Sequence, residues 1–462
     1  MESPVGPRCW VRLTLHPVVP VVMDDFTLIS IALLGTVAGS CIAQLPGLHV
    51  YNVAGGVLVA SINTSLHGMP LAMLWIGLLV GWVISNTIPS IFLYAPDDAN
   101  AFTVLPATRL LLRGQGFEAA LLVGGGSLGA LICLAVLAPA LSDLLRPLHQ
   151  IIQPHYGWML AAIVAFLLLS EWPRNDDRST APHSRLLGAW GYLGAGLATF
   201  TLSGLLGFVL SYSSPIAVSA AYQNLLPAFV GLFAVPSLIQ VVLYGVQPPR
   251  QNQTAFHPSA RSLLQGTLSG LAGGAFAAFL PVISGGIGAM LSGAATAQRD
   301  DRLFLISQGA SKVTYYAGSL LLLFVPGLGL VRGGMAWMLS SVYMPDGYHT
   351  YWLAIAAMAF GGVLAFGLLI LFARIASALS ERVPVRIIAL CSLGVAASIT
   401  LGFTGLAGLA VMAVATSVGL IPILIGGRRM NCLGILLVPM TLNLLGYGPS
   451  IASWMGLIGS LR

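Results

Sequence analysis

Residues 35–56 read GTVAGSCIAQLPGLHVYNVAGG, and residues 270–291 read GLAGGAFAAFLPVISGGIGAML. Both stretches are apolar and are interrupted by glycine and proline. A shift of 235 residues aligns five of their positions: Gly35 on Gly270, Gly39 on Gly274, Ala43 on Ala278, Leu45 on Leu280 and Pro46 on Pro281. Broken apolar segments at corresponding points of two halves are a sequence indicator of a binding site in secondary transporters. The pair therefore predicts a membrane chain built from two related halves.

The composition of the 462-residue chain excludes an ordinary soluble protein. Apolar residues make up 57% of it, charged residues 7%, and the mean hydropathy is +0.90, whereas soluble domains carry roughly a quarter charged residues. The net charge of +6 comes from arginines between apolar runs, so we expect a lipid bilayer around the chain and no nucleic-acid partner. The five cysteines have no metal-binding spacing, and we expect neither a metal nor a cofactor.

Apolar runs of about 20 residues cross a bilayer as helices. Five such runs follow each broken segment, near residues 71–93, 117–141, 151–170, 187–209 and 223–245, and near 303–330, 350–373, 387–403, 406–426 and 431–450. The broken segments themselves, 26–66 and 262–296, suit hairpins that enter and leave on one side. We therefore predict an all-α polytopic membrane protein with two inverted-topology repeats, each a re-entrant, broken-helix hairpin plus about five transmembrane helices.

The predicted repeats divide the chain into residues 23–245 and residues 262–462, joined by a cytoplasmic linker at 246–261. Residues 1–22 are expected to be a disordered tail, or to precede a biological start at Met23. An odd number of spans separates the two hairpins, so the halves would have opposite orientations.

The arginines give the orientation of the predicted spans. Fourteen of them fall on one face: Arg109, Arg113, Arg174, Arg178, Arg185, Arg250, Arg261, Arg299, Arg302, Arg374, Arg382, Arg386, Arg428 and Arg429. Five fall on the other: Arg8, Arg12, Arg146, Arg332 and Arg462. Cytoplasmic loops carry the excess of positive charge. The bias predicts a multi-pass protein of the cytoplasmic (inner) membrane whose first face is cytoplasmic.

The two breaks are the first candidate binding site. A helix interrupted inside a membrane exposes backbone polar groups, which are tolerated where they line a cavity, and a free helix N-terminus attracts anions. The candidate substrate-binding residues at the breaks are Pro46, Gly47, His49 and Asn52, and Pro281, Ser284, Gly285 and Gly286. Gly285 and Gly286 would allow the backbone to approach a ligand closely. The alternative interpretation is a pair of kinked packing helices.

Lys312 is the second candidate, because it is the single lysine and lies about ten residues into a predicted span. An ionisable residue at that depth indicates a functional site. Its partner would be a substrate anion or backbone carbonyls, with Asn86, Gln308 and Ser311 completing a polar lining. Asp97 and Asp98 belong to an acidic loop that would gate the path or bind a cation; the alternative is a solvated cytoplasmic loop. Na+ or H+ would be the coupling ion.

An enzyme is not expected. The G-x-S-x-G pattern at residues 125–129 lies in a glycine-rich apolar run with no strand before it.

Three blocks of the sequence resemble the TctA family, the large membrane subunit of tripartite tricarboxylate transporters. They are GSCIAQLPGLHVYNVAGG at 39–56, IPSIFLYAPDDANAFTVLPATRLLLRGQGFEAALL at 88–122 and DRLFLISQGASKVTYYAGSLLLLFVPGLGLVRGGM at 301–335. The sequences of these blocks are similar to those of the archaeal-type, stand-alone branch of that family. The resemblance implies a secondary transporter with inverted repeats, and it places Pro46, Gly47 and the 281–286 stretch at the substrate site.

The chain departs from the family pattern at two positions: Val282 stands where a glycine is expected, and Lys312 where a neutral polar residue is expected. The ISGG sequence of the second break instead resembles a motif of the polyprenyl-phosphate transporters. The leading hypothesis is a secondary carrier of a small organic anion, a carboxylate, by alternating access. The alternatives are a translocase of a lipid phosphate such as undecaprenyl phosphate and a membrane scaffold without transport. A homodimer and small membrane or periplasmic binding subunits are left open as partners.

Overall fold

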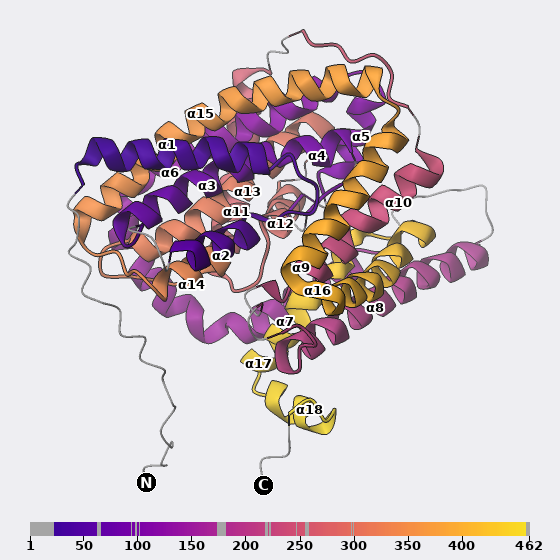
Figure 1. Cartoon of the computed structure of the whole chain (residues 1–462). Coiled ribbons are helices and arrows are strands. Elements are labelled where there is room, and N and C mark those ends of the chain that lie inside the picture. Colours follow the sequence, from indigo (N-terminus) through magenta and orange to yellow (C-terminus); the bar gives the residue numbers. More distant parts are fainter. Residues whose placement is uncertain are drawn as a thin grey trace, which may run out of the picture.

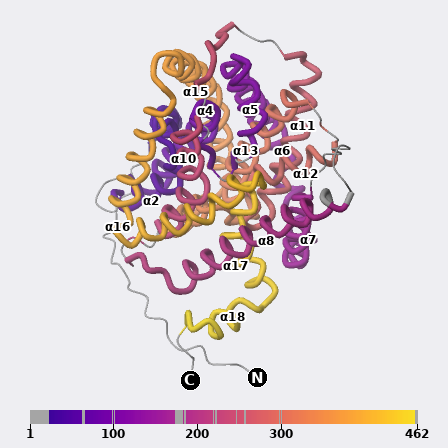
Figure 2. The backbone as a smooth tube through the Cα atoms, turned by 90° about the vertical axis from the view of Figure 1, so that its right-hand side faces the viewer, coloured from indigo at the N-terminus to yellow at the C-terminus, as the bar shows by residue number. Residues whose placement is uncertain are grey.

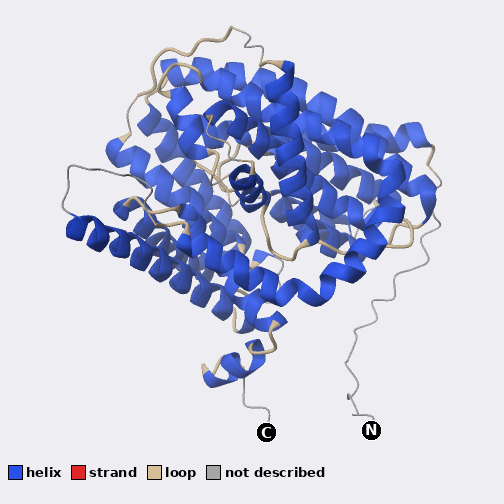
Figure 3. Cartoon of the chain, turned by 180° about the vertical axis from the view of Figure 1, so that it is seen from behind, coloured by secondary structure: helices blue, strands red, loops and turns tan. Residues whose placement is uncertain are grey.

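A computed structural model describes residues 23–61, 66–93, 95–97, 99–100, 102–172, 182–217, 220, 223–245, 247–254, 258–296, 298 and 300–458. Within these ranges all regular structure is helical (Figures 1 and 3). The predicted tail at 1–22 and Asp98 lie outside them. Among the described residues, seven helical stretches, some of which join consecutive helices, are long and apolar enough to cross a membrane, and a pair bent by 110° near the C-terminus would make eight. The prediction of an all-α polytopic membrane protein is confirmed.

The first broken segment forms two helices, α1 (Asp25–Ile42) and α2 (Val50–Ser61). The side chain of Asp24 accepts a hydrogen bond from the backbone N–H of Thr27 and so caps the start of α1. The chain then enters α3 (Met69–Ser85) and α4 (Thr87–Phe92), which meet at Asn86. Nearly all of α3 is buried, so this helix lies in the interior of the bundle and not at its lipid-facing surface.

The second broken segment has the same order of helices, α11 (Ala260–Phe279), α12 (Gly285–Ala295) and α13 (Asp301–Phe324). Its packing differs, because α12 lies against α11 and α13, whereas the main contacts of α2 are with α3 and α14 (Gly333–Ser340) rather than with α1. Shifted by 235 residues, α1 would cover 260–277, α2 would cover 285–296 and α3 would cover 304–320. The helix bounds of the two halves therefore correspond to within a few residues at the shift found in the sequence. The opposite orientation of the halves and the division into domains stay predictions.

Glycines explain why the corresponding helices pack so closely. A Cβ added at Gly39 of α1 would lie 2.2 Å from the carbonyl oxygen of Leu78 in α3. At the equivalent Gly274 of α11 it would lie 2.4 Å from the carbonyl oxygen of Ser311 in α13. In a membrane, helices associate through close packing of small residues because water does not drive their association. The first helix of each broken segment, α1 or α11, is therefore held to the next long helix in the same way.

The remaining helices are α5 (Val104–Leu111), α6 (Gly116–Ile152), η1 (Gln153–His155), α7 (Tyr156–Leu169), α8 (Pro182–Tyr212), α9 (Leu226–Phe229), the π-helical turn η3 (Val230–Ala234), α10 (Val235–Tyr244), α14 (Gly333–Ser340), α15 (Gly347–Arg382), α16 (Val385–Ile425), η4 (Arg429–Leu433), α17 (Gly434–Leu444) and α18 (Gly448–Trp454). Most coincide with predicted spans. The two spans expected near 387–403 and 406–426 correspond to the two parts of α16, which meet at a kink at Gly405, where φ is +67° and ψ is −164°. The span expected at 303–330 ends earlier, at Phe324.

The helices gather into two main apolar clusters. The larger unites α1, α3, α6, α13 and α15, and the smaller unites α7, α8, α12, α16 and α17. In Figures 1 and 2 the helices of the larger cluster occupy the upper part of the molecule, while α8, α17 and α18 lie in the lower part. Phe279 belongs to the larger cluster, Leu280 and Ile283 belong to the smaller one, and Tyr315 of α13 packs against both, so the second break lies where the two clusters meet.

Candidate functional site

Both helix breaks line the same cavity, which has a volume of about 580 Å³. The first break contributes Gly47 and His49 to its wall, and the second contributes Leu280, Pro281 and Val282. Asn52 and Tyr51 from the start of α2 face the same space. The structure therefore brings together Gly47, His49, Asn52 and Pro281, four of the residues that the sequence indicated.

One cation lies in the wall of this cavity, in the part of the chain that the structure describes. It is Arg332, in the segment between α13 and α14. Its Nε donates to the carbonyl oxygen of Phe279, 3.2 Å away, at the C-terminal end of α11. Its Nη2 donates to the hydroxyl of Tyr156 at 3.0 Å, and the guanidinium lies over the Tyr156 ring, 5.1 Å from its centre. These contacts hold the half-buried Arg332 at the second break.

The sequence analysis did not identify Arg332 as a site residue. It counted Arg332 only among the arginines of the outer face. One feature of the sequence could have indicated Arg332: it is a charged residue between an apolar run and Gly333-Gly334, shortly after the helix that contains Lys312. A Cβ added at Gly334 would lie 2.9 Å from the ring of Tyr51, so small residues are needed beside this arginine for α2 and α14 to meet.

Aromatic side chains hold His49 at the first break. The backbone N–H of Tyr51 donates to His49 Nδ1 at 3.1 Å, and His49 Nε2 lies 2.9 Å from the hydroxyl of Tyr316. Because Nδ1 accepts a hydrogen bond, the neutral ring carries its proton on Nε2 and donates it to Tyr316. The indole of Trp82 is tilted by 53° to the imidazole, with the ring centres 4.5 Å apart, and it donates to the carbonyl oxygen of Leu48 at 3.1 Å. The break is thus fixed by contacts from α3 and α13.

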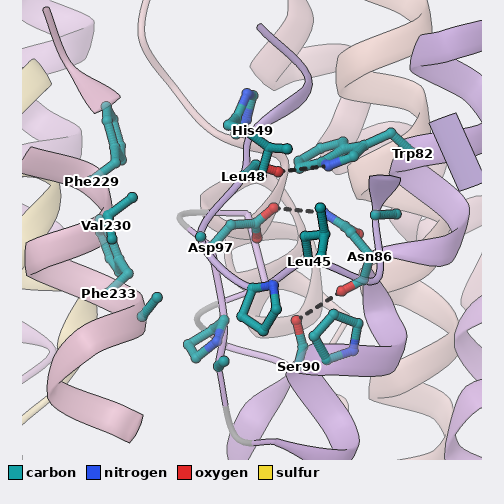
Figure 4. Close-up of a pocket in the computed structure, with 17 residues that line it drawn as sticks. Leu45, Leu48, His49, Trp82, Asn86, Ser90, Asp97, Phe229, Val230 and Phe233 are labelled. Atoms are coloured by element: carbon teal, nitrogen blue, oxygen red, sulfur yellow. Dashed lines mark hydrogen bonds between the residues drawn. The ribbon is translucent and has the colours of Figure 1, made fainter. Parts of the chain in front are cut away.

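A smaller pocket of about 50 Å³ lies beyond the first break (Figure 4). Pro46, Asn86 and Asp97 line it, and it shares Gly47, His49 and Phe229 with the larger cavity. Phe229, Val230 and Phe233 face the break from the opposite side in Figure 4. Val230 and Phe233 belong to the π-helical turn η3, and such turns occur frequently at functional sites. His49 and Gly47 therefore separate a space that contains Arg332 from one that contains Asp97.

Lys312 lines neither space but lies in a buried polar cluster next to the smaller one. Its Nζ donates three hydrogen bonds, to Asn86 Oδ1 at 2.7 Å, Thr87 Oγ1 at 2.9 Å and Asn100 Oδ1 at 3.1 Å. Three donated bonds are what an ammonium group can make. The sequence suggested a substrate anion or backbone carbonyls as its partners, and the structure provides three side-chain oxygens instead.

Asp97 completes the cluster. Its Oδ2 accepts from Asn86 Nδ2 and its Oδ1 from the backbone N–H of Asn100, both at 2.7 Å. The same two asparagines present their side-chain oxygens to Lys312, so the Asn86 side-chain amide and the Asn100 backbone N–H connect the carboxylate to the residues that bind the ammonium. The acidic loop predicted to gate the path or bind a cation contributes Asp97 to this buried network and not to a solvated surface.

The four second-half residues Gly285, Gly286, Ser284 and Ser311 lie outside both cavities. A Cβ added at Gly285 would lie 2.7 Å from Lys312 Cα, and one at Gly286 would lie 2.7 Å from the carbonyl oxygen of Ala99. We expected these glycines to let the backbone approach a ligand; in the structure they let α12 approach α13 and the Ala99 segment. Ser311 Oγ donates to the carbonyl oxygen of Gly285 at 2.7 Å and secures this contact.

Gln308 and Ser284 are buried with no hydrogen-bond partner among the described residues. Gln308 lies one helical turn before Lys312 on α13 and Ser284 directly before α12. The polar lining predicted around Lys312 therefore consists of Asn86, Thr87 and Asn100, and neither Gln308 nor Ser311 contacts the ammonium.

Comparison with known proteins gives one family match and one relative. A family model described as "Tripartite tricarboxylate transporter TctA family" matches residues 29–434. An uncharacterized protein of Methanocaldococcus jannaschii is 28% identical over 313 residues, which cover 66% of this chain and 70% of that protein. No solved structure matches the chain.

Proposed function

Because the chain belongs to the tripartite tricarboxylate transporter TctA family, we propose that it carries a small organic anion, a carboxylate, across the membrane through the cavity between its two helix breaks. The family is that of the large membrane subunit of tripartite transporters, and the chain is a multi-pass membrane protein. The substrate class and the route are the proposal.

Arg332 is the observation that carries this proposal. Two of the five N–H groups of its guanidinium donate to protein atoms of the described chain, Phe279 and Tyr156, which leaves others for a ligand. Guanidinium groups bind carboxylates through paired, charge-assisted hydrogen bonds. The arginine is fixed at the end of α11, so the site for a carboxylate is preorganised beside the second break.

The size and lining of the cavity fit a small organic molecule. Ligand sites occupy roughly 300–1,000 Å³ and combine apolar walls with a few polar groups, and this cavity has about 580 Å³. Phe229, Tyr315 and Trp337 supply apolar surface, and Asn52 and Asn224 supply amides. A carboxylate on Arg332 would place the rest of the molecule among these groups.

The position of the cavity supports an alternating-access mechanism. Its wall contains residues from both breaks, and the two apolar clusters of the bundle meet beside it. A movement of one cluster against the other would change access to the cavity without dismantling it. We propose the cytoplasmic membrane as the location and small membrane and substrate-binding subunits as partners. The family match does not favour the lipid-phosphate alternative.

Replacement of Arg332 tests the proposal. A screen of di- and tricarboxylates against the purified chain, by thermal shift and titration calorimetry, should find a ligand that the Arg332→Gln variant binds about 10- to 100-fold more weakly, since a hydrogen bond to a charged group contributes roughly 1.5–3 kcal/mol. Arg146→Gln is the matched control, because Arg146 donates to the carbonyl oxygen of Gly327 in the same inter-helix segment but does not line the cavity.

Two results would contradict the proposal. One is wild-type affinity for the carboxylate in Arg332→Gln at an unchanged melting temperature. The other is an equal loss of affinity in Arg146→Gln, which would assign the effect to the loop and not to the cavity. Binding of undecaprenyl phosphate in place of every carboxylate would instead support the lipid-phosphate alternative.

A further inference from the structure

The cluster around Lys312 has the composition of a site for a monovalent metal cation. Three uncharged side-chain oxygens, from Asn86, Thr87 and Asn100, surround its Nζ at 2.7–3.1 Å. One carboxylate, that of Asp97, supplies a single negative charge and is held by the Asn86 side-chain amide and the Asn100 backbone N–H. Uncharged oxygens and carboxylates are the ligands that hard cations prefer.

The occupant of this site is part of the chain. Lys312 is 1% exposed, and an ammonium so deeply buried is stable only where acceptors and an opposite charge replace water. Among the described residues, Asp97 is the charged group whose electrostatic interaction with Lys312 is evident. The charges of Lys312 and Asp97 cancel within the cluster, so removal of the ammonium would leave one negative charge surrounded by oxygens.

The site connects the two halves of the chain. Its oxygens come from the α3–α4 junction and from the Asn100 segment, while its cation comes from α13. The start of α12 packs on both, through Gly285 against Lys312 and Gly286 against Ala99. Asp97 and Asn86 also line the smaller pocket together with Gly47 of the first break. A cation at this position therefore stabilises the contact between one break and the other.

We propose that the ammonium of Lys312 occupies the position of a bound monovalent metal cation, so that this chain carries a covalently attached cation in place of Na+. The inference concerns a different site from the carboxylate cavity and does not depend on the identity of the substrate. A lysine that served only to fill space would leave no cation site behind when truncated.

Thermal unfolding of the purified full chain in detergent tests this proposal without any substrate. Wild-type protein should have the same apparent melting temperature in NaCl and in choline chloride of equal ionic strength. Lys312→Ala should melt lower in choline chloride, and Na+ should raise its melting temperature saturably, by at least about 3 °C. The double variant Lys312→Ala/Asp97→Asn should lose this response, because the negative charge that attracts the ion is removed.

The outcomes separate the alternatives. A saturable Na+ response in Lys312→Ala that disappears with Asp97→Asn supports the substituted cation. Equal melting of Lys312→Ala in both salts overturns it, and so does a saturable Na+ stabilisation of the wild type. If Lys312→Ala does not fold, Lys312→Gln, which retains most of the side-chain length, is measured in the same way with the same expected response. If NaCl stabilises neither variant, the result counts against the proposal. Loss of carboxylate binding in any variant bears on the cavity and not on this inference.

Discussion

The two helix breaks have similar backbones but different residues at the central position. The 235-residue shift places Gly47 on Val282, and both have positive φ, 84° and 55°. Glycine adopts this conformation at no steric cost, whereas a β-branched residue there is an outlier. Val282 is the only such non-glycine residue in the described chain. The second break therefore keeps a left-handed turn that its own sequence opposes, which indicates that its surroundings impose the turn.

The contacts of the two breaks explain this difference. The first is followed by His49, whose ring is held by Tyr51, Tyr316 and Trp82. The second is followed by Ser284, whose hydroxyl has no partner among the described residues. It is fixed instead by Arg332 on the carbonyl of Phe279 and by close packing of α12 on α13. Aromatic side chains and the hydrogen bonds of His49 organise the first break, whereas one arginine and close helix packing organise the second.

The largest expected effect concerns the glycines that the two halves share. Gly39→Ala and Gly274→Ala should each destabilise the protein by about 3 kcal/mol, because the new methyl group would overlap a backbone carbonyl of the next helix. Reversible unfolding in mixed SDS micelles measures both. Gly402→Ala is the control, since the space around Gly402 is open. A large loss of stability in one of the two variants and none in the other would contradict the equivalent packing of α1 and α11.

A smaller loss of stability is expected when Gly47 of the first break is replaced by valine, the residue at the equivalent position of the second break. Gly47→Val should cost about 2 kcal/mol, because the strain of a left-handed β-branched residue is of the order of 1–3 kcal/mol. The added Cβ would lie 3.4 Å from both Val230 methyl groups, at the short end of ordinary contact, and the two further methyl groups of the valine would have to fit in the same space. The same unfolding measurement applies. Unchanged stability would mean that the first break also tolerates this residue and that the comparison between the breaks fails.

The smallest effect is expected for the reverse change. Val282→Gly relieves strain, but it also removes partly buried methyl groups and increases the conformational freedom of the unfolded chain by roughly 0.5–1 kcal/mol. These contributions oppose one another, so the stability should stay within about 1 kcal/mol of wild type. Carboxylate affinity should change more than stability, because Val282 lines the cavity. A loss of several kcal/mol would show that Val282 stabilises the break by its packing.

The sequence by itself determined the class of the protein and the positions of its breaks. Apolar length and the scarcity of charge predict spanning helices, because a bilayer demands them wherever the backbone crosses it. Glycine and proline at Pro46, Gly47 and Pro281 mark where helices stop, since both residues act on the local backbone. These are local or compositional properties. The sequence also identified Lys312, because a lone lysine in an apolar run is conspicuous without any knowledge of its neighbours.

Only the tertiary structure decided what these features contact. Asn86 and Lys312 lie 226 positions apart, and Arg332 and Tyr156 lie 176 apart. No pattern along the chain specifies such pairs, because helix packing and not sequence spacing brings them together. The fold places Arg332 in the cavity wall and Asp97 beside Lys312 as its counter-charge. It uses Gly285 and Gly286 for helix packing. The sequence specifies the chemistry of each side chain, but the tertiary structure determines which groups it contacts.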